Sequence, residues 1–226
     1  MTGPDRTTAV GQLPTPASGG SRVPATLTRL VWLLWVASLG VLALYYWSDG
    51  PWELWGLVAV DGLTVVMWLA VTFFSGIVHS YSRRYMAGNR AIDRFFARTF
   101  AFTLVVMVLV AAEHLAVFWA AWLGMGLVMA RLVGHVDGWP QAQAAAGLAR
   151  RYFLASSAAL AVALVALWWH TGATTVSGVA SAVEAGSAAG TTPATAVLAA
   201  TGALLLAAMV QSALVPFHMW LLASMT

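Results

Sequence analysis

Long apolar runs separated by short polar stretches dominate the chain from residue 30 onward. A hydrocarbon core about 30 Å thick needs roughly 20 helical residues to cross it. The runs that we expect to cross a membrane as helices cover about residues 30–47, 54–78, 95–112, 115–133, 148–169 and 194–215. Each run is continuous rather than alternating, so strands are not indicated. The pattern predicts an all-α integral membrane protein with about six transmembrane helices.

The segments outside these runs are read from their residue types. Residues 1–26 are rich in Thr, Pro, Gly and Ser, so we expect a disordered cytoplasmic tail there and one transmembrane domain over residues 27–226. Residues 171–193, with Gly, Ala, Ser, Thr and the single acid Glu184, read as a flexible outer loop.

Composition supports this class and excludes several functions. Hydrophobic residues make up 61% of the chain and charged residues 8%, whereas soluble domains carry about 25% charged residues. There is no Cys, which excludes disulfides and thiolate metal sites. The five His are scattered, and no phosphate-binding loop, nucleophile elbow or paired carboxylates appear. We therefore expect no metal, no cofactor, no nucleic-acid partner and no catalysis by this chain.

The positions of the basic residues predict orientation, because cytoplasmic loops collect Lys and Arg. All eleven basic residues are Arg, and with six spans all of them fall on one side. The turns at 48–53, 113–114 and 171–193 contain none. This arrangement predicts a multi-pass protein of the plasma (inner) membrane with both termini in the cytoplasm.

Polar residues in or near the spans are costly in lipid and need a reason. Asp61-Gly62 is interpreted as a helix-start cap. His79 is interpreted as a solvated imidazole at the cytoplasmic end of its span, and Gly124 and Gly126 as helix-packing positions. Glu113-His114, in a tight outer turn, either gates protons at a channel mouth or forms a solvated turn. The sequence leaves both readings open.

The last segment, residues 211–221, places Gln211, Ser212, Pro216 and His218 within about two helical turns. Proline removes a backbone hydrogen bond and clashes with the preceding turn. Interrupted transmembrane helices are where transporters often place ion sites. We therefore expect the last helix to be broken near Pro216, and these four residues with Glu113 and His114 are the candidates for an ion path. A simple proline kink is the alternative.

Three stretches resemble one family. Residues 60–64 (VDGLT), residues 80–96 (SYSRRYMAG followed by RFF) and residues 211–221 (QSALVPFHMWL) are similar to the antiporter-like proton-channel subunits of complex I (the L-type subunit), the Mrp antiporters and DabB, a membrane partner in inorganic-carbon accumulation. The matches cover about residues 57–135 and 205–225, and the chain looks like the N-terminal part of such a subunit. Residues 121–132 and 149–156 look closest to the DabB branch.

The resemblance also shows two departures. Complex I-type members place Glu where this chain has Leu123, and Lys where it has Gln211. The usual Glu–Lys couple that relays protons is therefore missing, and no other Lys replaces it.

Three functions follow from these readings. The first, implied by the DabB resemblance, is a membrane subunit that passes protons down their gradient to energise a soluble, zinc-containing, carbonic-anhydrase-like (DabA-like) partner in CO2/bicarbonate accumulation. The second is a proton- or sodium-translocating subunit of a complex I-like or Mrp assembly with other membrane subunits. The third is a non-conducting membrane scaffold.

Overall fold

The computed structural model describes residues 21–48, 50–89, 91–190 and 194–225. Their helices are α1 (Val23–Trp47), α2 (Gly62–Tyr85), α3 (Ile92–Ala111), α4 (Leu115–Val133), α5 (Pro140–Thr171), α6 (Val176–Ala188), α7 (Ala194–Gln211) and α8 (Met219–Met225). The tail expected over residues 1–26 lies mostly outside the described residues, and residues 23–26 already form the first turn of α1.

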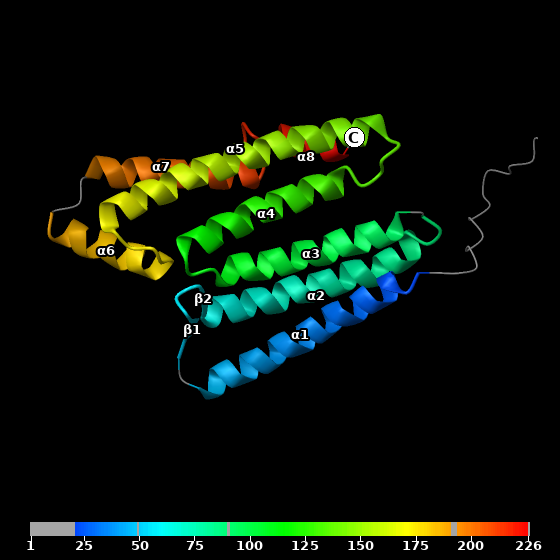
Figure 1. Ribbon diagram of the computed structural model, residues 1–226, viewed down its shortest axis with the longest axis horizontal. Helices are drawn as coiled ribbons and strands as arrows, with labels where there is room; N and C mark the ends of the chain where they lie inside the picture. Colours follow the sequence, from blue (N-terminus) through cyan, green and yellow to red (C-terminus); the bar gives the residue numbers. More distant parts are fainter. Residues whose placement is uncertain (1–20, 49, 90, 191–193, 226) are drawn as a thin grey trace, which may run out of the picture.

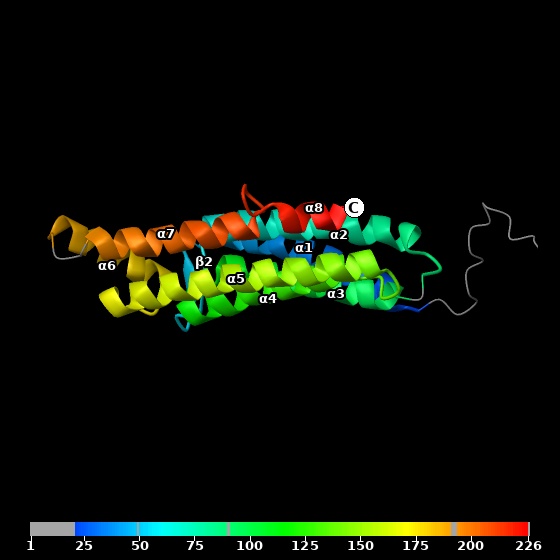
Figure 2. The ribbon, with the colours of Figure 1, turned by 90° about the horizontal axis from the view of Figure 1, so that it is seen from above.

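The helices form an elongated bundle in which successive helices from α1 to α5 run antiparallel to one another (Figure 1). Each of them packs against the next along the chain, and α1 also contacts α3. Helices α7 and α8 pack on α5. Figure 2 shows α8 continuing roughly along the line of α7 after a short irregular segment. The bundle is therefore a row of hairpin-connected helices, closed at one side by a broken pair.

The molecule is a multi-pass membrane protein. Helices α1 to α5 are each long and apolar enough to cross a membrane, and α7 is a shorter apolar helix. Large apolar side chains cover their outside, among them Leu33, Phe74 and Leu198, which are 62%, 65% and 73% exposed. Such a surface is unfavourable in water but matches hydrocarbon. The predicted class and the count of about six spans are confirmed, with α7 and α8 together as the broken sixth.

The arginines of the described residues lie toward one end of the bundle, on the right in Figure 1, which we call the arginine end. They occupy the start of α1, the end of α2, the start of α3, the end of α4 and the N-terminal half of α5. His135, just beyond α4, is buried there beside the Arg94–Asp137 ion pair. Burial, and then the charges of Arg98 and Arg94, lower the pKa of His135 below its usual value.

Close helix contacts occur where glycine leaves room. A Cβ added at Gly126 in α4 would lie 2.7 Å from the Cβ of Phe153 in α5, and one at Gly76 in α2 would lie 3.0 Å from the ring of Trp32 in α1. At Gly124 the nearest atom, in Val105, is at an ordinary 3.5 Å. The packing interpretation is therefore confirmed at Gly126, while Gly124 sits in ordinary van der Waals contact.

Two local predictions were wrong. The apolar run from residue 54 begins as an antiparallel hairpin of β1 (Trp52–Leu54) and β2 (Val58–Val60), whose turn places Trp55 and Gly56 at positive φ. Strands of three residues are too short to show alternation, so the pattern missed them. Helix α2 starts only after Asp61, whose side chain accepts a hydrogen bond from the Thr64 amide at 2.7 Å, which confirms the cap.

The second error lies at the end opposite the arginines. The loop expected over residues 171–193 contains α6, whose N-cap Thr175 accepts a hydrogen bond from the Gly178 amide. Its many small residues hid the helix, because Ala, Gly, Ser and Val give almost no contrast between an apolar and a polar face.

Candidate functional site

The chain between α7 and α8 breaks by a defined backbone motif. Ala213 has φ 53°, in the left-handed region. The Leu214 amide donates to the Met209 carbonyl at 3.0 Å and the Ala213 amide to the Val210 carbonyl at 3.4 Å. This is the pair of bonds that ends a helix in a Schellman motif. Helix α7 therefore stops at Gln211 because the next residues satisfy its last carbonyls by turning back on them.

Pro216 favours the break, whereas Ala213 opposes it. Pro216 has no amide hydrogen, so it cannot donate to the carbonyl of Ser212 as a continuing helix would require. Ala213 occupies a conformation that costs an ordinary L-residue roughly 1–2 kcal/mol and that glycine adopts freely. Strain of this kind persists only where the surroundings hold it. The expected break near Pro216 is confirmed, and the backbone turns into the left-handed region at Ala213.

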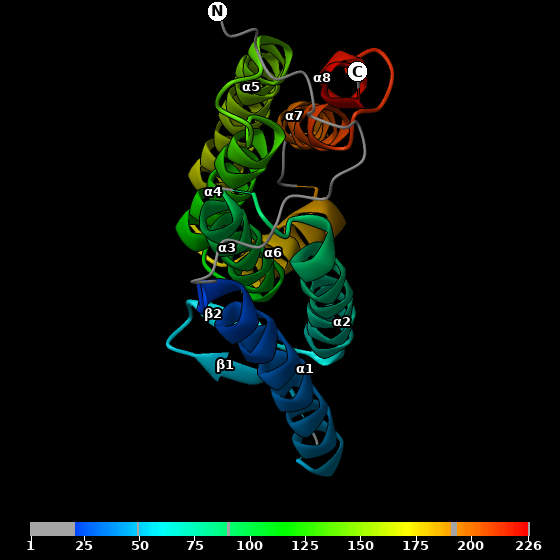
Figure 3. The same cartoon turned by 90° about the vertical axis from the view of Figure 1, so that its right-hand side faces the viewer.

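Trp220 holds the two halves of the broken helix together. Its indole Nε1 donates to the Val210 carbonyl at 3.1 Å, which spans the break from α8 back to α7. Its ring packs edge-on against Phe153 of α5, with centroids 4.7 Å apart, in a buried cluster with Ala130 and Ala149. Figure 3, which looks at the arginine end, shows α7 and α8 beside α5 and away from α1. The break is thus anchored on α5.

Two polar atoms at the break have no partner within the described residues. Gln211 Oε1 and His218 Nδ1 are both inaccessible, and neither makes a hydrogen bond. A buried acceptor without a partner costs about 1–3 kcal/mol unless water or a proton satisfies it. Ser212, between them in sequence, is exposed, as is Pro216. The site therefore has two buried groups able to accept a hydrogen bond or a proton, one on each side of the break.

A serine of α5 connects α7 to α4. Ser156 is fully buried, and its Oγ donates to the Ala207 carbonyl of α7 at 2.9 Å while accepting a hydrogen bond from Trp122 Nε1 of α4 at 3.0 Å. The neighbouring Ser157 Oγ is buried without a partner among the described residues. The sequence analysis missed both serines. Their spacing within an apolar run was the only available signal.

Glu113 and His114 lie elsewhere, at the end opposite the arginines. Glu113 is 9% exposed, and its Oε1 accepts from the Ser177 amide at 2.9 Å and the Ser177 hydroxyl at 2.5 Å, in the first turn of α6. A carboxylate at a helix N-terminus is favourable for both hydrogen bonding and the helix dipole. The amides of both residues donate to the Leu57 carbonyl beside β2. Glu113 is therefore buried rather than solvated, and the turn fixes α6 and the hairpin.

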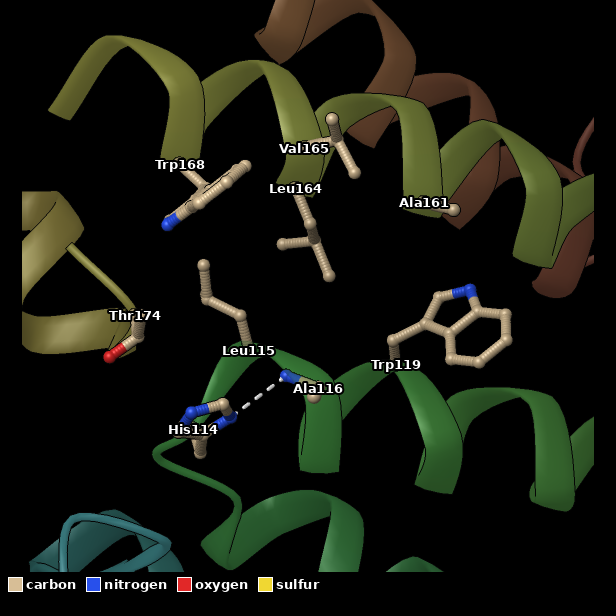
Figure 4. Close-up of a pocket in the computed structure, with 9 residues that line it drawn as sticks. All are labelled: His114, Leu115, Ala116, Trp119, Ala161, Leu164, Val165, Trp168 and Thr174. Atoms are coloured by element: carbon tan, nitrogen blue, oxygen red, sulfur yellow. Dashed lines mark hydrogen bonds between the residues drawn. The ribbon is translucent and has the colours of Figure 1, made fainter. Parts of the chain in front are cut away.

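His114 caps α4, and its ring borders an apolar groove. Its Nδ1 accepts a hydrogen bond from the Ala116 amide at 3.2 Å. The groove, about 470 Å³, lies between α4 and α5, and Figure 4 shows Leu115, Trp119, Leu164 and Trp168 around it with His114 below. Its walls are almost wholly apolar, so the groove offers no ligand set for a cation.

His79 is the clearest correction among the polar residues. It was interpreted as solvated, yet it is 1% exposed and lies between α2 and α3. The interpretation rested on the position of His79 at the cytoplasmic end of its span, which does not show which face of the helix carries the side chain. Within the described residues, no group of three or more His, Asp or Glu side chains is arranged to hold a metal ion.

Comparison with known families gives a direct assignment. The model described as NADH:quinone oxidoreductase/Mrp antiporter, TM, matches residues 112–226, and the one described as NADH-Ubiquinone oxidoreductase (complex I), chain 5 N-terminus, matches residues 56–96. This chain belongs to the NADH:quinone oxidoreductase/Mrp antiporter membrane family. The second match includes β2, Asp61 and the stretch that ends in Phe95-Phe96.

The alignments with individual relatives cover a larger share of this chain than of the relative. NADH-ubiquinone oxidoreductase chain 5 of Cryptococcus neoformans is 33% identical over 177 residues, 77% of this chain and 26% of the relative. NADH-quinone oxidoreductase subunit L of Rickettsia typhi is 36% identical over 77 residues, 34% of this chain and 12% of the relative. The chain therefore spans about a quarter or less of the length of these curated relatives.

A solved structure shares the fold. Respiratory complex I from Thermus thermophilus contains a chain that superposes with a TM-score of 0.66 at 21% identity, over 89% of this chain and 42% of that one. These relatives carry complex I names. They support the complex I-like or Mrp reading of the sequence better than the DabB reading that the sequence analysis placed first.

Proposed function

We propose that this chain is part of a membrane subunit that translocates protons in a complex I-like or Mrp-type assembly. The observation that carries the proposal is the broken helix α7–α8, with Gln211 Oε1 and His218 Nδ1 buried and unpartnered beside it. Groups of this kind are stable in the membrane when water or a transported ion reaches them.

The two residues have different roles in this proposal. His218 binds and releases the proton, because an imidazole is the side chain whose charge changes near neutral pH. Gln211 cannot ionise, and its amide orients water beside the break. Where the family resemblance places Lys, this chain therefore has a neutral hydrogen-bonding group, and the titratable group sits seven residues later, on the far side of the break.

The arrangement of charge supports an orientation. The arginine end faces the cytoplasm, since positive residues are retained on that side, and the hairpin and α6 face the opposite compartment. The membrane is the plasma (inner) membrane. The chain itself catalyses no reaction, and other membrane subunits supply the energy that its proton movement couples to.

The test is proton flux into liposomes that contain the purified chain, driven by a potassium diffusion potential and followed with an enclosed pH-sensitive dye. Gln211→Leu and His218→Phe keep size and remove the polar groups. We expect each to lower flux about tenfold or more, because a positioned proton carrier commonly contributes that much. Met219→Leu, at a neighbouring exposed side chain, is the matched control and should retain flux. Unchanged flux in both site variants would show that protons do not pass by these two groups, whereas no flux in the unmodified chain would leave the scaffold reading.

A role in inorganic-carbon accumulation is the second candidate. It is favoured by Leu123 and Gln211, which stand where complex I-type members have Glu and Lys. Purification of the chain from its native membrane separates the two candidates. Recovery of a soluble zinc protein of the carbonic-anhydrase type supports the second, whereas recovery of quinone-reductase subunits supports the first.

A further inference from the structure

A line of polar side chains runs along one face of α2 and its cap, apart from the broken helix. Its members recur every three or four residues: Asp61, Thr64, Trp68, Thr72, Ser75, His79 and Ser82. Residues with this spacing lie on one face of a helix. The face is turned toward α3, since Trp68 Nε1 donates to the Met107 carbonyl and Ser75 meets Thr103. Five of the seven are buried, although the helix is membrane-spanning.

Most of this line is explained by local bonding. The Thr72 hydroxyl donates to the Trp68 carbonyl of its own helix at 2.7 Å, and the Thr64 hydroxyl to Asp61 at 2.8 Å. A hydroxyl that donates a hydrogen bond to an acceptor about one turn earlier in its own helix is satisfied, so its burial needs no further explanation. His79 and Ser75, whose hydroxyl meets Thr103 of α3, are not explained in this way.

One ring nitrogen of His79 has a hydrogen-bond partner, and the other has none among the described residues. Its Nδ1 lies 2.8 Å from the Ser75 carbonyl, which can only accept, so Nδ1 carries the hydrogen. The neutral ring then has its lone pair on Nε2. That nitrogen is inaccessible and makes no hydrogen bond within the described residues. The Phe96 ring, at a centroid distance of 5.4 Å and nearly perpendicular, packs against the imidazole from α3.

Hydroxyl groups lead from the ring toward the middle of the membrane. Ser75 Oγ lies 3.3 Å from His79 Nδ1 and 2.6 Å from Thr103 Oγ1 of α3. Thr103 Oγ1 also lies 3.0 Å from the Thr99 carbonyl. Ser75 is one turn farther than His79 from the arginine end, so this hydroxyl pair lies on the inner side of the imidazole. No acidic or basic side chain among the described residues is hydrogen-bonded to the ring.

We propose that His79 is a second proton-binding site of this chain and that Ser75 and Thr103 relay its proton between α2 and α3. The inference rests on the proposed function. A proton from the arginine end binds Nε2, and the imidazolium releases its Nδ1 proton to Ser75 Oγ. Ser75 passes its own hydroxyl proton to Thr103 Oγ1, and Thr103 gives its proton to a water molecule deeper in the membrane. One proton enters and one leaves, which leaves the ring with hydrogen on Nε2. The ring then turns toward the arginine end, where water protonates Nδ1 and takes the Nε2 proton, and this exchange restores the starting tautomer without net transfer.

The flux assay described above tests this relay. His79→Gln should lower flux about tenfold or more, since glutamine retains hydrogen bonding but cannot carry a proton. Thr103→Val, which keeps the shape and removes the hydroxyl, should also lower flux, and Thr103→Ser should restore it. Ser38→Ala is the matched control, because Ser38 is 2% exposed on α1 and, among the described residues, its hydroxyl bonds only to the Leu34 carbonyl of its own helix.

The outcomes separate this inference from the proposed function. Flux that falls in the Gln211 and His218 variants but not in the His79 and Thr103 variants overturns the relay alone. A loss in Thr103→Val that Thr103→Ser does not restore indicates packing and also overturns it. If the unmodified chain passes no protons, the proposed function fails. Nitrogen-15 NMR of the chain in lipid nanodiscs then decides His79. The site requires hydrogen on Nδ1 and reversible protonation of Nε2 in acid, and the opposite tautomer contradicts it.

Discussion

The buried polar groups of this protein occupy two regions that differ in how the backbone carries them. Between α2 and α3 both helices are continuous, and polar side chains line the contact at helical spacing. At α7–α8 the helix itself is interrupted, and the polar atoms flank the interruption. Buried polar side chains can therefore line the face of a continuous membrane helix or flank a break in one. The second arrangement requires tertiary anchors that the first does not.

The strongest anchor of the break is Trp220. Trp220→Ala removes the contact with Phe153 and the hydrogen bond to the Val210 carbonyl, and we expect it to cost about 3–5 kcal/mol. Thermal unfolding in detergent measures the loss. Trp169→Ala, at a side chain that is 77% exposed, should change little. Equal effects of the two substitutions would show that α8 is not held by this cluster.

A smaller effect is expected at the contact that supports α5 behind the break. Gly126→Ala would place a Cβ 2.7 Å from the Cβ of Phe153, and overpacking of this kind costs about 1–3 kcal/mol. Gly124→Ala, two residues away with 3.5 Å of room, is the control and should be nearly neutral. The same unfolding measurement compares them. A neutral Gly126→Ala would mean that α4 and α5 are farther apart than described.

The strained backbone predicts a substitution that stabilises. Ala213→Gly relieves the left-handed conformation and should raise the free energy of unfolding by about 1 kcal/mol. Ala208→Gly, within α7, should lower it by about 1 kcal/mol. Opposite signs for the same chemical change, five residues apart, distinguish a broken helix from a continuous one. If both substitutions destabilise, the helix continues through residue 213.

On the other side of the comparison, α2 depends on its cap. Asp61→Ala should cost about 1 kcal/mol. The Thr64 amide bond lowers the pKa of the Asp61 carboxyl below its ordinary value of 3.8. The cap therefore contributes stability above that value and loses it as the pH falls through the lower, folded-state pKa. Asp61→Asn still caps the helix, and its unfolding should not show this acid-dependent loss. An identical pH profile for the two proteins would contradict the cap.

Much of the fold was predictable from apolar length alone. The run at residues 115–133 coincides with α4, and the run at 95–112 differs from α3 by three residues at its start. Each error has a physical cause. Helix α5 begins at Pro140, eight residues before its predicted start, because its first turns carry Gln and Ala outside the apolar run. The hairpin is too short, and α6 is too uniform in small residues, for either to show a period of apolar and polar positions.

The candidate site was predictable only in part. Pro216 predicted the break, because proline interrupts a helix through its own backbone, without a partner elsewhere in the fold. The anchors Trp220 and Ser156 could not be recognised, since their roles depend on Val210, Phe153 and Ala207, which are distant in sequence or placed by the fold. The burial of His79 could not be predicted, because it depends on Phe96 of α3, which packs against this face of α2. Glu113 acquired its partner only through α6, which the pattern did not reveal.

Water reaching the broken helix is the physical condition for proton movement there. Because the chain contains no Cys, single cysteines at Gln211→Cys, His218→Cys and the lipid-facing Leu205→Cys report access without background. Labelling of the chain in liposomes by a small, charged thiol reagent should be fast at positions 211 and 218 and absent at 205. Equal protection of all three positions from the reagent would contradict a water-accessible break.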